Sequence, residues 1–80
     1  MNKSLLELLE EEKKEIANIR WSRESVADFI SYAENKKEGY HEESCYKIAS
    51  EYEEKAKKSE EKLKEIRKEI KQYLSFLMEL

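Results

Sequence analysis

The sequence predicts an all-α protein: an antiparallel two-helix coiled-coil hairpin that turns near Gly39 and dimerises into a four-helix bundle. Three observations predict this fold. First, charged residues make up 44% of the chain, proline is absent and Gly39 is the only glycine, a composition typical of long helices. Second, apolar residues recur on both sides of that glycine at alternating spacings of four and three, which defines one seam per helix. Third, the two seams pair in reverse order around Gly39, with Glu12 opposite Ile66, for example.

The first helix is predicted over about residues 4–37. Ser4 and Glu7 match the S-x-x-E capping box, which satisfies free backbone amides where a helix begins. A second capping pattern, from Ser25 to Asp28, offers an alternative start that would give a three-helix bundle. The heptad phase continues through this stretch and favours one uninterrupted helix. The predicted seam includes two charged residues and contains Leu5, Leu9, Glu12, Ile16, Ile19, Arg23, Val26, Ile30 and Ala33.

The turn is predicted over about residues 36–41, because glycine readily takes the left-handed conformation that ends a helix. The second helix is predicted over about residues 42–79, where Glu42 and Glu43 suit the positive end of its dipole. The whole chain, residues 1–80, is therefore predicted to form a single domain. The seam of the second helix contains Cys45, Ala49, Tyr52, Ala56, Ser59, Leu63, Ile66, Ile70, Tyr73, Leu77 and Leu80.

The predicted seam is too thin to stabilise an isolated hairpin. Ala49, Ala56 and Ser59 bury little apolar area, and two helices alone cannot enclose the charge of Arg23. The open end, in contrast, has more apolar side chains than one seam can cover. Because two-fold dimers are the commonest oligomers, we predict a homodimer that joins through these residues: Leu5, Leu6, Leu8, Leu9, Tyr73, Leu74, Phe76, Leu77, Met78 and Leu80.

The outer faces of the two predicted helices differ in charge. The second helix carries many Glu–Lys pairs four residues apart, such as Glu54 with Lys58, which is typical of a solvated face. The first helix has few charges on its outer side, where Trp21 and Tyr32 lie three helical turns apart. Tryptophan, tyrosine and arginine are enriched at protein interfaces. We therefore predict a partner-binding patch, with packing of the indole inside the protein itself as the alternative: Trp21, Arg20, Ser25 and Tyr32.

The sequence predicts no catalytic residue, no cofactor and no metal site. Glu38 and His41 have a spacing that recurs in di-iron bundles, but they lie at the turn and no second set of seam carboxylates accompanies them. The single cysteine, Cys45, occupies a seam position and is predicted to be a small core residue. Glycine-rich phosphate loops, nucleophile elbows and zinc-spaced ligands are absent from the sequence.

Charge and cysteine content restrict the partners. A net charge of −3 and a pI near 5.3 disfavour nucleic acid, whose phosphates attract basic proteins. Lys57, Lys64 and Lys71 recur every seven residues, but glutamates lie between them. A single cysteine cannot form a disulfide within the chain, which is typical of proteins in a reducing compartment. The absence of a long apolar run argues against a signal peptide or a membrane span, so we expect a cytoplasmic protein.

These observations together predict a non-enzymatic protein–protein interaction module. It would act as an adaptor or a small inhibitor, of the viral, phage or toxin-neutralising kind, that binds and occludes a larger protein through a helical face. Two alternatives stay open at this point. One is a purely structural, self-assembling helical bundle, and the other is a weak nucleic-acid-binding accessory protein.

Overall fold

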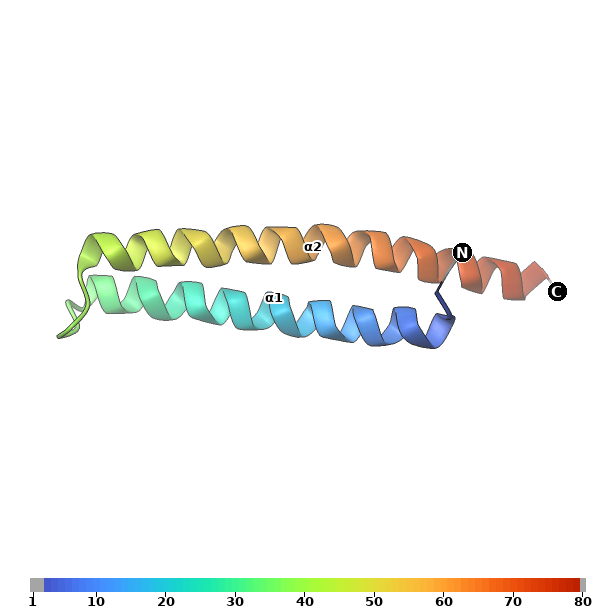
Figure 1. Ribbon diagram of the computed structural model, residues 1–80, viewed down its shortest axis with the longest axis horizontal. Coiled ribbons are helices and arrows are strands. Elements are labelled where there is room, and N and C mark those ends of the chain that lie inside the picture. Colours follow the sequence, from blue (N-terminus) through green and yellow to red (C-terminus); the bar gives the residue numbers. More distant parts are fainter. Residues whose placement is uncertain (1–2, 80) are drawn as a thin grey trace.

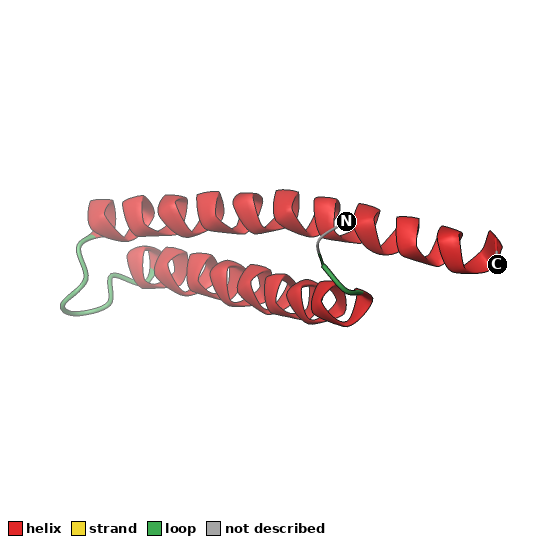
Figure 2. Ribbon diagram, turned by 45° about the vertical axis from the view of Figure 1, so that its right-hand side comes forward, coloured by secondary structure: helices red, strands yellow, loops and turns green. Residues whose placement is uncertain are grey.

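The computed structural model describes residues 3–79 and confirms the predicted all-α hairpin, with two antiparallel helices joined by one turn (Figure 1). Helix α1 covers Leu5–Glu34 and helix α2 covers Glu42–Glu79. The hairpin is a rod 61 Å long and 17 by 14 Å across. Helix α2 continues past the start of α1, so its last turns have no helix beside them (Figure 2).

Helix α1 begins at the predicted cap and continues without a break. The hydroxyl of Ser4 accepts a hydrogen bond from the backbone N–H of Glu7 at 3.2 Å. The alternative start at Ser25 is not used, and the three-helix alternative is therefore wrong. Instead, the hydroxyl of Ser25 donates to the carbonyl of Trp21 at 3.0 Å, which is how a serine within a helix commonly satisfies its hydroxyl.

Helix α1 ends three residues before its predicted end, at Glu34. The N–H of Asn35 donates to the carbonyl of Ser31 at 2.9 Å, and the next residue, Lys36, has a φ angle of 49°. This left-handed conformation stops the helix. Gly39 has a φ angle of 87° and provides the second left-handed position of the turn. The early end was not predicted because residues other than glycine rarely adopt this conformation.

Helix α2 has the predicted bounds, and its predicted seam is confirmed along most of its length. Its first turn closes where the N–H of Cys45 donates to the carbonyl of His41 at 2.9 Å. Four seam residues are buried, namely Cys45, Ala49, Ala56 and Leu63. Five more are half-buried: Tyr52, Ser59, Ile66, Ile70 and Tyr73. Leu77 is exposed, and Leu80 lies outside the described residues.

Six of the nine predicted residues of the α1 seam are correct and three are wrong. Ala33 is buried, and Leu5, Glu12, Ile19, Val26 and Ile30 are half-buried as predicted. Leu9, Ile16 and Arg23, in contrast, are exposed, and the residue just before each of them is buried. Those buried residues are Leu8, Glu15 and Ser22. Helix α1 is thus rotated by part of a turn relative to the prediction, although its heptad spacing is unchanged.

The rotation of α1 follows from the next residue in the same heptad row, Phe29. Its ring lies between the helices and stacks on Tyr52 of α2, with 6.1 Å between the ring centroids and 18° between the planes. Rotation in the opposite sense would expose this aromatic surface. Arg23 gains from the rotation as well, because its guanidinium stays in solvent and forms an ion pair with Glu60.

The core of the hairpin is small, as predicted. Within residues 3–79 the buried apolar side chains include two leucines, the other four being alanine or cysteine: Leu8, Ala33, Cys45, Ala49, Ala56 and Leu63. The ion pair between Glu12 and Arg67, at 3.0 Å, agrees with the predicted register to within one residue. Within residues 3–79, neither helix has a segment long and apolar enough to cross a membrane.

Candidate functional site

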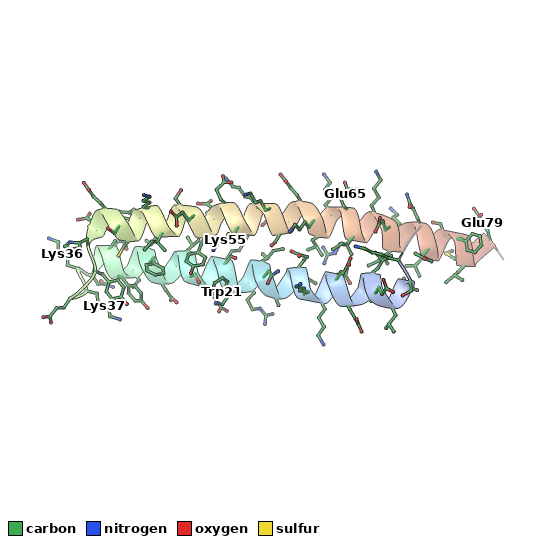
Figure 3. All side chains as sticks on the ribbon, viewed as in Figure 1. Trp21, Lys36, Lys37, Lys55, Glu65 and Glu79 are labelled. Carbon is green, nitrogen blue, oxygen red and sulfur yellow. The ribbon has the colours of Figure 1, made fainter. Side chains whose placement is uncertain are left out.

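Trp21 lies on one long face of the hairpin, and its side chain reaches across to α2. The edge of one ring meets the face of the other where Trp21 packs on Tyr52, with 5.1 Å between centroids and 83° between planes. The indole is nevertheless 55% exposed. Figure 3 shows Trp21 on α1 and Lys55 on α2 at the same level of the rod. Trp21 therefore packs against its own chain and still presents more than half of its surface to solvent.

Trp21 is one end of a connected set of aromatic rings that we call the aromatic row. Phe29 contacts both Tyr32, at 5.5 Å between centroids, and Tyr52, and Tyr32 contacts Tyr40 of the turn at 4.8 Å. The row comprises Trp21, Phe29, Tyr32, Tyr40 and Tyr52. Such edge-on and stacked pairs fix the rings beyond what burial alone achieves.

Two lysines lie over rings of the aromatic row. The ammonium of Lys37 is 4.3 Å from the centre of the Tyr32 ring, and that of Lys55 is 4.9 Å from the Tyr52 ring. A cation over an aromatic face is attracted by the negative charge density of that face. The two lysines are therefore held near the row, one at the turn and one beside Trp21.

A shallow hollow of about 260 Å³ lies next to Trp21, and we call it the tryptophan hollow. Asn18 and Trp21 border it on α1, and three lysines border it on α2, namely Lys55, Lys58 and Lys62. The three lysines share one side of α2 because they are three and four residues apart. An apolar ring beside three ammonium groups suits a protein surface that offers both an apolar side chain and carboxylates.

The structure brings together only part of the predicted partner-binding patch. Trp21 and Tyr32 belong to the aromatic row. Ser25 is half-buried, and its hydroxyl donates a hydrogen bond to the carbonyl of Trp21. Arg20 is exposed, but successive helical residues point about 100° apart, and no contact joins it to the aromatic row among the described residues. Arg20 is thus outside the site, and Lys55 supplies a cation there instead.

The predicted oligomer interface is exposed for the most part, with one clear exception. Leu8 is only 1% exposed because it fills the seam of its own hairpin. Leu5 and Tyr73 are half-buried, and the hydroxyl of Tyr73 donates to the carbonyl of Lys3. Leu80 lies outside the described residues. The remaining six, which we call the apolar end, are exposed: Leu6, Leu9, Leu74, Phe76, Leu77 and Met78.

A second hollow, of about 520 Å³, lies on the same side of the rod closer to the open end. Glu15 lines it and is 8% exposed, and its Oε2 atom has no hydrogen-bond partner. Nearby, Lys3 forms an ion pair with Glu11 at 2.8 Å, and this hydrogen-bonded carboxylate raises the pKa of the Lys3 ammonium above its ordinary value. Within residues 3–79 no group of three or more histidine, cysteine, aspartate or glutamate side chains is placed to bind a metal ion.

The chain matches no known protein family, no characterised protein and no solved structure. The arrangement of its surfaces is therefore the basis for the function proposed below. Two surfaces described so far expose large apolar side chains: the tryptophan hollow exposes the indole of Trp21, and the apolar end exposes six side chains.

Proposed function

We propose that this protein is a protein-binding module that contacts a larger partner through Trp21 and the tryptophan hollow. By covering part of the partner's surface it would act as a small inhibitor, or as an adaptor if a second surface is used at the same time. The single observation that carries this proposal is the state of Trp21, which is packed on Tyr52 and yet 55% exposed. Tryptophans of this kind dominate binding energy at many interfaces.

The packing of Trp21 favours binding in a second way. A side chain that orders only on binding loses conformational entropy, at a cost of about 0.5–1.5 kcal/mol. Tyr52 already limits the motion of the indole through its edge-to-face contact. The lysines around the hollow add ammonium groups for carboxylates of the partner, and such rim charges chiefly increase the association rate.

Replacing Trp21 with alanine should weaken binding to the partner by at least about 2 kcal/mol, which is roughly 30-fold. The partner would be captured from a lysate of the source organism with the tagged chain, identified by mass spectrometry, purified, and titrated by calorimetry. Helicity by circular dichroism should not change. Glu24→Ala is the matched control, because Glu24 is an exposed residue of the same helix that does not border the tryptophan hollow.

Two results would contradict the proposal for Trp21. One is that Trp21→Ala binds the captured protein with unchanged affinity. The other is that Trp21→Ala and Glu24→Ala weaken binding equally, which would show that the contact is not specific to Trp21.

A structural role in self-assembly is the second candidate function, and the apolar end supports it. Met78 is 87% exposed and Leu6 is 68% exposed, and burying such side chains contributes about 25 cal/mol per Å². Pairing of two hairpins through this end would bury them in a homodimer.

Changing Leu74 and Phe76 to glutamate should then convert a dimer into monomers in light scattering. Both side chains are about half exposed, Leu74 at 49% and Phe76 at 59%, so the hairpin itself should stay folded. Gln72→Glu with Ser75→Glu is the control, since it adds the same charge at exposed positions of the same helix. A wild-type protein that is monomeric at about 100 µM would remove this role, because a dimer weaker than that is not a stable assembly.

A further inference from the structure

The face of the rod opposite Trp21 is built from two other heptad rows. On α1 the row contains Leu9, Ile16, Arg23 and Ile30, and on α2 it contains Tyr46, Glu53, Glu60, Arg67 and Leu74. Residues seven apart lie on one side of a coiled-coil helix. The ion pair between Arg23 and Glu60 joins the two rows across the hairpin, so they form one continuous surface, which we call the groove face.

The groove face has an apolar floor. A hollow of about 530 Å³ lies at its middle, lined on α1 by Val26 and Ile30 and on α2 by Ala56. Four large side chains of these rows are exposed along the rod: Leu9 at 44%, Ile16 at 39%, Tyr46 at 43% and Leu74 at 49%. Apolar residues at heptad intervals along a groove between two helices suit the apolar stripe of a third helix.

The margins of the groove face are basic. Lys13 and Arg20 lie outside the α1 row, and Lys57, Lys64 and Lys71 lie outside the α2 row, all of them exposed. Among the acidic residues of this face, Glu60 pairs with Arg23 and Glu12 pairs with Arg67, and Glu53 has no ion pair within the described residues. The five basic side chains of the margins outnumber Glu53. The groove face is therefore positive although the chain has a net charge of −3.

We propose that the groove face binds an acidic amphipathic helix of a partner protein, which lies along the groove as a third helix. Its apolar stripe would cover Leu9, Ile16 and Leu74, and its flanking glutamates or aspartates would face the lysines of both margins. This site is separate from the tryptophan hollow and does not depend on it.

Charge decides between this occupant and two others. A second copy related by a two-fold axis would place its own basic margins against those of the first, and like charges across an interface cost several kcal/mol. Nucleic acid matches the charge, but the four exposed apolar side chains along the groove have no counterpart in a phosphate backbone. An acidic amphipathic helix has carboxylates to pair with the basic margins and an apolar stripe to pack on the apolar floor.

The test uses a synthetic 28-residue helical peptide with leucine and isoleucine at the two seam positions and glutamate at the flanking positions. The like charges of this peptide keep it from pairing with itself. Calorimetry with the full chain should give at least about 100-fold tighter binding than for the same peptide with lysine at the flanking positions, and affinity should fall as salt rises.

Two pairs of charge reversals locate the site. Lys13→Glu with Lys64→Glu, on the groove face, should weaken peptide binding by about tenfold or more. Lys55→Glu with Lys58→Glu, which border the tryptophan hollow, should change it less than about twofold. Ile16→Ser should weaken binding without changing the salt dependence, and circular dichroism should show that all variants stay helical.

The fluorescence of Trp21 separates this proposal from the function proposed above, because Trp21 lies on the other face. Saturation with the acidic peptide should leave its emission unchanged. The proposal is overturned if the emission shifts, if both peptides bind equally, if the reversal at Lys55 and Lys58 weakens binding as much as that at Lys13 and Lys64, or if a 20-nucleotide DNA strand or duplex binds more tightly than the peptide. None of these results bears on the Trp21→Ala measurement.

Discussion

Replacing Leu8 with alanine is expected to lower the free energy of unfolding by about 2–4 kcal/mol. Leu8 is 1% exposed and is one of two buried leucines among the described residues of the core. Removing its side chain leaves a cavity in the seam that the two helices can close only in part. A domain of this size is stabilised by only about 4–12 kcal/mol, and urea denaturation followed by circular dichroism would register the loss as a much lower midpoint.

Leu6→Ala is the matched control for Leu8→Ala. The two residues are chemically identical, two positions apart on the same helix, and differ in exposure, 68% against 1%. An exposed leucine contributes little, so the change in unfolding free energy should stay within about 0.5 kcal/mol. Equal losses for the two variants, measured at a concentration that keeps the protein monomeric, would show that the seam does not run through Leu8.

Replacing Glu15 with leucine is expected to stabilise the hairpin by about 1–3 kcal/mol. Glu15 occupies a buried seam position at 8% exposure, and its Oε2 atom has no hydrogen-bond partner. Leucine removes a poorly solvated carboxylate and adds apolar contact at the same position. For a chain of this length each kcal/mol corresponds to about 4–8 °C in melting temperature, so a thermal melt at pH 7 would detect the change.

Two further variants identify the cause of this effect. Glu10→Leu makes the same substitution at an exposed position of α1 and should change stability by no more than about 0.5 kcal/mol. Glu15→Gln removes the charge but keeps the shape, so a partial gain would assign that part to charge burial. A loss of stability in Glu15→Leu would mean that the carboxylate has a partner that the leucine cannot replace.

The turn and α2 could be predicted from the sequence because local signals there agree with one another. Gly39 marks the reversal, and the residues of the α2 seam are small or apolar at regular intervals, so polarity alone identifies the buried side. In α1 the alternating spacing of four and three selected Leu9 and Ile16, although Leu8 is as apolar as Leu9. The two rows differ by only part of a turn, and the choice between them depends on how Phe29 fits against Tyr52. That fit involves both helices and is not visible in either one alone.

In the candidate site, too, the features that depend on one helix could be predicted, and those that depend on both helices could not. Trp21 and Tyr32 could be placed on one side of α1 because their spacing is a multiple of the helical repeat. Arg20 was grouped with them on the strength of its residue type, and helix geometry separates it from them. Tyr40 and Tyr52 were missed because they come from the turn and from α2. Only the register of the two helices brings them to Phe29.

The position of the aromatic row beside the turn has a consequence for the order in which the hairpin forms. Tyr32 and Tyr40 are close in the sequence and in contact, whereas Lys3 and Tyr73, which meet at the other end, are 70 residues apart. Loop-closure entropy adds about 0.6 kcal/mol for each doubling of loop length, or about 2 kcal/mol between these two contacts. We therefore expect the hairpin to form from the turn outward, with the contacts between the aromatic rings as its first tertiary contacts. The open end closes last and is the first part to fray.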